Sequence, residues 1–306
     1  MANLREIKTR MKSIRDTQQI TNAMYMISSS KLQKARVALD NTVPYFETLK
    51  HTIAYILQHM QNEVTDVYFN NLDGTVKNPE RRGYIIITAD KGLAGAYNMN
   101  VLKAVSAHLS EDIKSKLFVV GEVGRQYFMH RGIKTVSDFN FTANNPTVNR
   151  ARRITGRVLD RYLDNKLDEV YIIYTKNKGA AQCETVMEKL LPLSRPDFQQ
   201  MGSLGADNRE MSFYPSETSV LHAIIPNYIS GYVYGALIES FCSEQHSRMT
   251  AMQSANDSAA DMLRELDIEY NRVRQAAITQ EISEVVGGAK VLLQKKKKKE
   301  EGKLYD

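Results

Sequence analysis

The sequence predicts an α/β protein in which a Rossmann-like domain is inserted between two long helices that pair as an antiparallel, intrachain coiled coil. Three observations lead to this fold class. Apolar residues recur in steps of three and four along residues 1–60, the same period returns along residues 217–294, and short β-branched runs lie between them. A sustained 3.5-residue repeat is typical of a helix that packs along one seam against another helix.

The first predicted helix covers residues 1–60. Its seam positions include Leu4, Ile7, Met11, Ile14, Gln18, Thr21, Tyr25, Ser28, Leu32, Ala35, Leu39, Phe46, Leu49, Ile53 and Ile56. The polar seam residues near the middle are expected to fix the register at some cost in stability. Pro44 falls inside the repeat, and because the apolar register continues beyond it, we expect a kink there rather than the end of the helix.

The middle of the chain changes character twice. Residues 61–82 lose the period and carry turn signals, so we expect a linker. Residues 83–205 are the predicted Rossmann-like domain, with β-branched runs at 84–88, 117–120 and 170–174 that are each followed by glycine and then by a helical stretch. Such alternation favours a parallel sheet covered by helices on both faces. Residues 206–216 are a second predicted linker.

The second long helix is predicted over residues 217–294, with Pro226 in its first turn. Its seam positions are Gly231, Gly235, Ile238, Cys242, Gln245, Met249, Met252, Asn256, Ala259, Leu263, Leu266, Tyr270, Val273 and Ala277. Gly231 and Gly235 are expected to allow close helix approach. Two seams separated by a compact insert pair as an antiparallel coiled coil within the chain. Residues 295–306 form a Lys-rich tail that we expect to be solvated.

Composition narrows the function little. The chain has 306 residues, a net charge of +6 and a sequence pI near 9.1, which suits a nucleic acid, an acidic protein or a membrane surface equally. Cys183 and Cys242 have no metal-site spacing, so we expect free thiols, with Cys242 in the core. No apolar run is long enough to span a bilayer, and the start lacks the features of a signal peptide. We therefore expect a cytosolic or matrix-side protein.

Motifs of catalysis are missing from the sequence. It contains no P-loop, no GxGxxG, no zinc-ligand spacing and no nucleophile elbow. The segments 90–95 and 121–124 each follow a predicted strand, and the backbone amides of 90–95 could donate hydrogen bonds to an anion. A tight turn that packs is the favoured interpretation of both. We therefore expect no catalytic, cofactor-binding or metal-binding residues, and a chain that is not itself an enzyme.

The C-terminal end of the second helix carries the most information about function. Val273 and Ala277 are seam positions, so Arg274 and Gln275 point off the seam. Beyond them the helix is apolar on more than one side, at Ile278, Ile282, Val285 and Val286. An apolar helix end without an intrachain partner must be covered by something else. We expect a sleeve formed by a partner protein.

Three separated motifs carry a family resemblance. They are TQQITNAMYM at 17–26 followed by Ser30 and Lys31, TADKGLAG at 88–95, and a C-terminal pair made of SEQHSRMTAM at 243–252 and RQAAITQEI at 274–282. With these motifs in this order, the chain resembles the gamma subunits of F-type rotary ATP synthases over essentially its whole length. The Lys-rich tail extends past the usual end of that family.

The resemblance implies a non-catalytic central rotor shaft. It would couple rotation of the membrane c-ring, driven by proton or sodium flow, to conformational change at the catalytic beta subunits. The implied partners are a hexamer of alpha and beta subunits, the epsilon subunit and the c-ring, with no cofactor. Met24 would face an acidic segment of beta, and Arg274 and Gln275 would bond to a beta loop. The implied location is the cytoplasmic face of a bacterial plasma membrane, peripheral through the complex.

Two other classes of function stay open from the residues alone. A basic coiled-coil arm could bind nucleic acid, although this needs aromatic side chains among exposed basic residues, and Tyr25 and Tyr270 lie on seams instead. The middle domain could also belong to a nucleotide-dependent enzyme. Salt-dependent affinity for DNA or RNA would support the first alternative, and binding of ATP or NAD the second.

Overall fold

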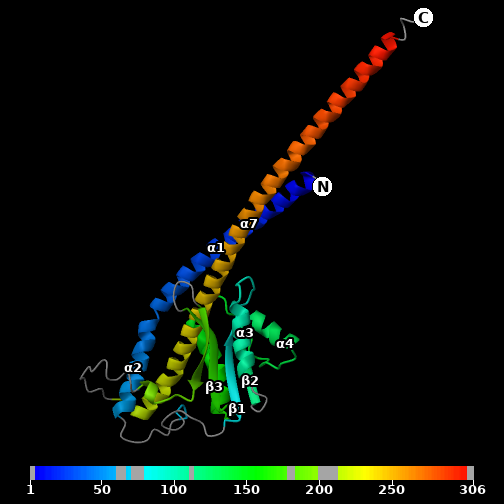
Figure 1. Cartoon of the computed structure of the whole chain (residues 1–306). Coiled ribbons are helices and arrows are strands. Elements are labelled where there is room, and N and C mark those ends of the chain that lie inside the picture. The colour runs from blue at the N-terminus through cyan, green and yellow to red at the C-terminus, as the bar shows by residue number, and fades with distance from the viewer. Residues whose placement is uncertain are drawn as a thin grey trace. The chain divides into compact units, whose positions relative to one another are not determined.

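The computed structural model describes residues 4–59, 67–69, 79–109, 114–177, 183–198 and 213–301. Parts of both predicted linkers and the last five residues of the Lys-rich tail lie outside these ranges. The chain forms two compact units, one of residues 1–24 with 252–306 and one of residues 25–251. Three helices account for the two ends of the chain: α1 (Leu4–Asp40), α2 (Val43–His59) and α7 (Glu217–Glu301) (Figure 1).

The first unit is an antiparallel helix pair made by the start of α1 and the later part of α7. Ile7, Met11 and Leu266 are buried against each other, and the residues packed around them are Ile14, Leu263, Tyr270 and Val273. All seven are predicted seam positions. Residues early in α1 therefore meet residues late in α7, which confirms the antiparallel coiled coil and its register.

A polar layer interrupts this apolar seam. Gln18 Nε2 donates to the Asn256 carbonyl over 3.4 Å, and the Thr21 hydroxyl donates to Asn256 Oδ1. Thr21 also bonds the Gln18 carbonyl at 3.0 Å. The Gln18 amide and the Thr21 hydroxyl thus find acceptors on Asn256 across the helix pair, the first on its backbone and the second on its side chain, as expected for polar seam residues that fix a register.

The expectation of one kinked helix around Pro44 is wrong. The helix α1 ends at Asp40, Asn41 and Thr42 form a turn, and α2 begins at Val43. Pro44 is thereby the second residue of a new helix, where its missing amide hydrogen leaves no helical bond unmade. The apolar period survives the break, since the seam positions Leu39, Phe46 and Leu49 on its two sides are all half-buried.

The second unit contains a four-stranded mixed sheet of order β2-β1-β3-β4. Its strands are β1 (Arg81–Ile87), β2 (Lys114–Val120), β3 (Glu169–Asn177) and β4 (Cys183–Leu191). The first three are parallel, with Ile85 aligned between Phe118 and Ile172. The strand β4 runs antiparallel to β3. A helix was expected after the third strand, and the structure has β4 there instead.

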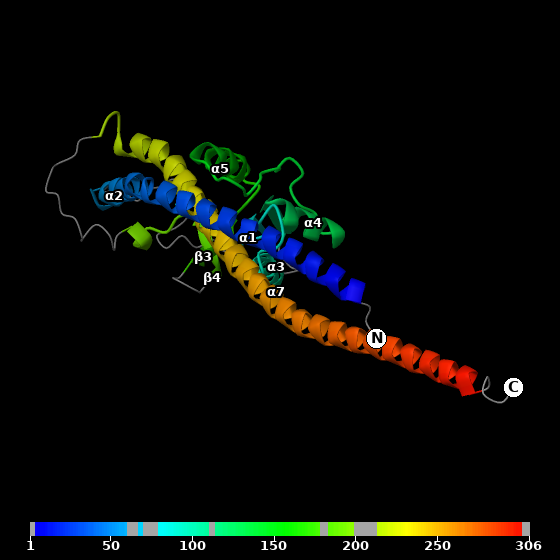
Figure 2. The ribbon, with the colours of Figure 1, turned by 90° about the horizontal axis from the view of Figure 1, so that it is seen from above.

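Helices cover both faces of the sheet, as predicted for a Rossmann-like domain. The helices α3 (Tyr97–His108) and α4 (Glu122–His130) pack on one face. The helix α5 (Val148–Leu163), together with α2 and the early part of α7, packs on the other (Figures 1 and 2). Residues on β1 alternate between the two cores, with Tyr84 and Ile86 on one side and Ile85 and Ile87 on the other.

The helices α2 and α7 approach closely at one of the two seam glycines. A Cβ atom on Gly231 would lie 1.8 Å from Cδ1 of Phe46, whereas a Cβ on Gly235 would meet nothing within 4 Å. The predicted role in close approach is therefore confirmed for Gly231 and wrong for Gly235. Cys242 is buried, as expected for a core residue.

The prediction that Pro226 marks the start of the C-terminal helix is also wrong. The helix α7 begins at Glu217 and includes Pro226. Ser216 precedes it, and its hydroxyl accepts the Ser219 amide at 3.2 Å, a typical N-terminal cap. The early turns of α7 are held by the core, in which Leu221 and Ile225 are buried, so tertiary packing sustains the helix through the proline.

Candidate functional site

The two polar residues singled out near the end of α7 are exposed to solvent. Arg274 and Gln275 lie outward, while Val273 and Ala277 beside them are half-buried on the seam. Within the described residues neither side chain has a hydrogen-bond or ion-pair partner. A guanidinium and an amide held on a rigid helix with unused donors suit binding to carbonyl or carboxylate groups of another protein.

The helix continues beyond Ala277 without an intrachain partner in the described structure. Every residue from 278 to 295 is exposed. Ile278, Ile282, Val285 and Val286 are among the exposed large apolar residues, and Val285 reaches 72% exposure. Val291, Leu292 and Leu293 extend the same surface. Seven large apolar side chains within sixteen residues form an apolar helix end of the kind that marks an interaction site.

Met24 lies at a different level of the helix pair. It is half-buried on α1. Because Thr21 bonds Asn256 in an antiparallel helix pair, Met24 lies at roughly the level of Met252, one turn earlier on α7. Arg274 is 22 residues further along α7, which corresponds to roughly 33 Å at the helical rise. The structure therefore does not bring Met24 together with Arg274 and Gln275, and any partner contacts at these residues occur at two separate heights.

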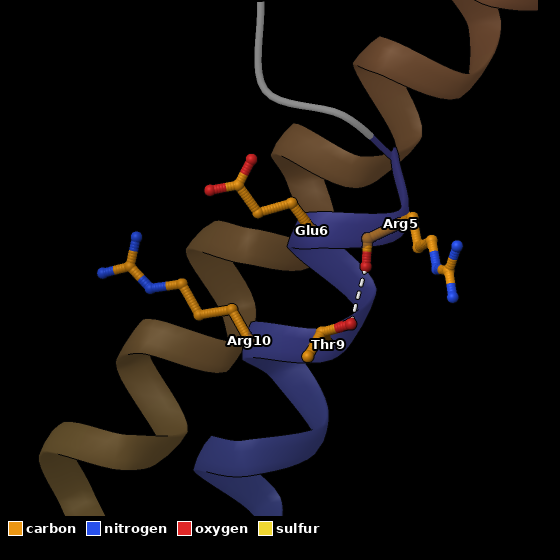
Figure 3. A pocket seen from close by; sticks show the side chains of 4 residues that line it. All are labelled: Arg5, Glu6, Thr9 and Arg10. Atoms are coloured by element: carbon orange, nitrogen blue, oxygen red, sulfur yellow. Dashed lines mark hydrogen bonds between the residues drawn. The ribbon is translucent and has the colours of Figure 1, made fainter.

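The start of α1 adds a basic surface that the sequence analysis did not single out. Arg5, Glu6, Thr9 and Arg10 line an open hollow, and the two arginine side chains extend to opposite sides of the helix α1 (Figure 3). The Thr9 hydroxyl donates to the Arg5 carbonyl over 2.8 Å. Because one helix supplies all four lining residues, this is an open helix surface and not an enclosed binding site.

A buried ion pair was missed by the sequence analysis. Glu244 and Arg248, one turn apart on α7, form a salt bridge of 2.7 Å, and both side chains are less than 10% exposed. Arg248 also donates to the carbonyls of Lys91 and Gly92, at 3.3 and 3.1 Å. Burial raises the pKa of Glu244. This contact joins two of the three resemblance motifs. The signal available in the sequence was the (i, i+4) spacing of Glu244 and Arg248, which does not indicate their contact with the 90–95 turn.

The 90–95 turn uses its own carboxylate to satisfy nearby amides. Asp90 accepts the Glu122 amide at 3.3 Å, and the Ala143 and Asn144 amides at 3.1 and 2.9 Å. The negative charge at the start of α4 is therefore supplied from within the chain. This arrangement agrees with a packed turn and disfavours an external anion there.

Metal-binding clusters and membrane-spanning helices are other features that a functional site could use. Within the described residues, no group of three or more His, Cys, Asp or Glu side chains is placed to hold a metal ion. Among the described helices, none combines the length and apolarity needed to cross a membrane. The candidate functional site is the surface along the helix pair that comprises Met24, Arg274, Gln275 and the exposed apolar end of α7.

The fold and this surface define a helical-stalk protein, a coiled coil with an α/β domain inserted between its two helices. The family model described as "ATP synthase" matches residues 3–292. The ATP synthase gamma chain of Ruminiclostridium cellulolyticum is 44% identical, over 95% of this chain and 99% of that protein. The sodium-ion-specific gamma chain of Acetobacterium woodii is 39% identical, over 95% and 99%. The chain belongs to the ATP synthase gamma chain family.

Solved structures agree on the fold. The central stalk of the Tetrahymena thermophila mitochondrial ATP synthase matches with a TM-score of 0.55 and 23% identity, over 77% of this chain and 99% of that one. The rotor of the Euglena gracilis mitochondrial ATP synthase matches with a TM-score of 0.60 and 16% identity, over 90% and 98%. At these identities the likeness supports the long helices and the mixed sheet.

Proposed function

We propose that this chain is the central rotor shaft of an F-type ATP synthase and is itself non-catalytic. The observation that carries the proposal is the exposed apolar end of α7, Ile278 to Leu293, which has no partner within the described chain. A soluble helix of this kind needs a protein sleeve, and a hexamer of alpha and beta subunits supplies one. Membership of the gamma chain family supports the same assignment.

Contacts with the beta subunits are assigned to two levels of the shaft. Arg274 and Gln275, exposed beside the half-buried Val273, would hydrogen-bond a beta loop in one rotary state. Met24, roughly 33 Å away along α7 by the helical rise, would face an acidic beta segment. Hydrogen bonds to a charged group are each worth about 1.5–3 kcal/mol, so losing the Arg274 contact would raise one rotary state by that amount.

Coupling would follow from the asymmetry of the shaft. Ile7 and Leu266 pair two helices at one level, whereas beyond Ala277 the described chain contributes α7 alone. A shaft with unequal sides contacts three surrounding beta subunits differently, and a difference in contact free energy is what shifts conformational populations. Rotation would move this bias from one beta subunit to the next.

The remaining parts of the proposal concern the α/β domain and location. The segment around 83–205 would be the domain that binds the epsilon subunit and the c-ring, between linkers at 61–82 and 206–216. The helices 1–60 and 217–294 would form the shaft, and 295–306 a Lys-rich extension. The chain would lie at the cytoplasmic face of a bacterial plasma membrane, held there through the complex.

The experiment compares three variants in the reconstituted complex with alpha and beta subunits. Removal of residues from Ile282 onward should weaken binding to the hexamer and leave the sheet folded, as judged by circular dichroism. Arg274→Ala should lower ATP turnover. Arg264→Ala is the matched control, because it removes the same charge from an exposed site on the same helix. Normal binding after truncation, together with equal turnover of Arg274→Ala and Arg264→Ala, would refute the proposal.

The nucleic-acid alternative finds no support. Tyr25 and Tyr270 are half-buried on the seam and offer no exposed stacking platform among basic residues. A DNA affinity that falls steeply with salt would be the observation in its favour.

A further inference from the structure

A shallow cavity lies at the outer edge of the sheet, where β2 is the edge strand. After α4 the chain returns alongside this strand, with an isolated bridge between Leu117 and Thr135 and a bond of 3.0 Å from the Val136 amide to the Leu117 carbonyl. The space between β2, this returning segment and α5 has a volume of about 320 Å³. Its polar lining comprises Ser115, Lys116, Lys134, Thr135, Ser137, Asp138 and Arg161.

The single carboxylate of the lining is already neutralised. Arg161 on α5 binds Asp138 at 2.7 Å, and Arg157 approaches the other carboxylate oxygen at 3.5 Å. The hydrogen bond from Arg161 holds the pKa of Asp138 below its usual value. Asp138 therefore stays ionised at neutral pH, and its charge is matched by the two arginines rather than by the lysines across the cavity.

Lys116 and Lys134 carry the uncompensated charge. In the described part of the chain, neither ammonium group has an ion pair or hydrogen bond. Lys134 is exposed and Lys116 is half-buried on β2. The hydroxyls of Thr135 and Ser137 likewise make no hydrogen bond to the described residues, so the cavity presents two cations and two free hydroxyl donors.

The charge of the surrounding segment favours the same kind of ligand. Residues 114–163, from the start of β2 to the end of α5, hold ten lysines and arginines and three acidic residues. Their net charge of +7 exceeds the +6 of the whole chain. The net positive charge of this protein is thus concentrated in one part of the α/β domain. The resulting positive potential attracts anions toward the cavity.

We propose that this cavity binds a phosphate group, with Lys116 and Lys134 contacting the oxyanion and Thr135 and Ser137 donating hydrogen bonds to it. Ammonium groups and hydroxyls are common phosphate ligands because they supply charge and donors to several oxygens at once. The lining includes no aromatic side chain on which a nucleobase could stack. The ligand is accordingly a compact phosphate: the free ion or the headgroup of an anionic lipid.

The test uses the full-length chain at low salt with two probes. Titration calorimetry with sodium phosphate measures binding of the free ion. Co-sedimentation measures binding to the headgroup, by comparing vesicles of phosphatidylcholine alone with vesicles that also contain phosphatidic acid. The variant Lys116→Gln/Lys134→Gln should weaken whichever binding occurs by at least tenfold. The control Lys12→Gln/Lys103→Gln removes the same charge at two exposed positions and should change it less than twofold.

The outcomes separate the sources of phosphate and decide the proposal. Saturable binding of the free ion, or binding only to the anionic vesicles, supports the site when the Lys116/Lys134 variant alone loses it. Lys116→Arg/Lys134→Arg should keep most of the affinity, because it keeps both positive charges. An unchanged circular dichroism spectrum of the glutamine variant excludes a folding defect as the cause of its loss. Three results would overturn the proposal. They are equal losses of binding in both glutamine variants, no binding of either probe, and binding of poly-glutamate by a chain that binds neither phosphate probe.

Discussion

Replacing Gly231 by alanine should force α2 and α7 apart, whereas the same change at Gly235 should not. The two glycines lie one helical turn apart on α7. A Cβ at position 231 would lie 1.8 and 2.0 Å from two ring carbons of Phe46, but a Cβ at 235 would meet nothing within 4 Å. Phe46 packs at the edge of the core and against Tyr234, with ring centroids 6.4 Å apart. The ring must therefore move, or the helices must separate.

The pair of variants isolates the cost of the clash. Alanine at either position gains about 1 kcal/mol of helix propensity over glycine, and this gain cancels when the two are compared. Overpacking a well-filled contact costs about 1–3 kcal/mol. Gly235→Ala should thus raise the free energy of unfolding by about 0.5–1 kcal/mol, and Gly231→Ala should lie about 1–3 kcal/mol below it.

Urea unfolding of the full chain, followed by far-UV circular dichroism, measures this difference. Comparing the double variant Phe46→Ala/Gly231→Ala with Phe46→Ala completes a mutant cycle. In the absence of the Phe46 ring, alanine at position 231 should stabilise the chain as much as alanine at position 235 does. Equal stabilities for Gly231→Ala and Gly235→Ala, with Phe46 present, would refute the close approach of the two helices.

Three further changes have defined outcomes. Asp168→Asn should cost about 1–2 kcal/mol at pH 7, because the amide side chain bonds two backbone amides more weakly than the carboxylate does. The hydrogen bond from Arg81 lowers the pKa of Asp168 from 3.8. The wild-type advantage is therefore present above pH 3.8 and should fade at lower pH in denaturant titrations. Arg248→Met should cost about 3–5 kcal/mol by leaving Glu244 buried and unpaired, and adding Glu244→Gln should recover much of that loss; a double variant no more stable than the single would contradict this. Gly288→Ala, where a Cβ meets nothing within 4 Å, should slow amide exchange in the end of α7 through a gain of about 0.5–1 kcal/mol.

The long helices were predictable because their period is a property of the sequence alone. Ile7, Met11 and Leu266 fall on a 3.5-residue repeat, and the buried residues of the helix pair are those positions. The parallel strands were also predictable, since their β-branched runs are bounded by glycine. The strand β4 was not, because Cys183–Leu191 mixes polar and apolar residues and owes its conformation to pairing with β3.

The prolines misled for a related reason. A proline restricts the backbone locally, but the surrounding packing decides whether the helix ends, restarts or continues there. Near Pro44 the chain turns and starts a new helix, whereas Pro226 lies within α7, whose neighbouring turns are buried in the core. The residues before each proline also differ: Asn41 and Thr42, types that favour turns and helix N-caps, precede Pro44, whereas Ile224 and Ile225 precede Pro226.

The candidate site was predictable where it depends on helix geometry and hidden where it depends on tertiary contact. The exposure of Arg274 and Gln275 follows from their offset from the seam. The bonds from Arg248 to the carbonyls of Lys91 and Gly92 cross more than 150 residues of sequence. No periodicity encodes such a contact, although the Glu244–Arg248 spacing is compatible with one.

The layer of Gln18, Thr21 and Asn256 fixes the axial position of one helix relative to the other. Sliding α7 along α1 by one turn in either direction would replace Asn256 by Met252 or Ala259 at that level. The Gln18 amide could still bond a backbone carbonyl, but the Thr21 hydroxyl would lose its side-chain acceptor on α7. A pull or twist applied to one helix is therefore resisted by the loss of a hydrogen bond as well as by the disruption of apolar packing. In a shaft that turns under torque, such resistance would keep the angular setting of one end reproducible from one revolution to the next.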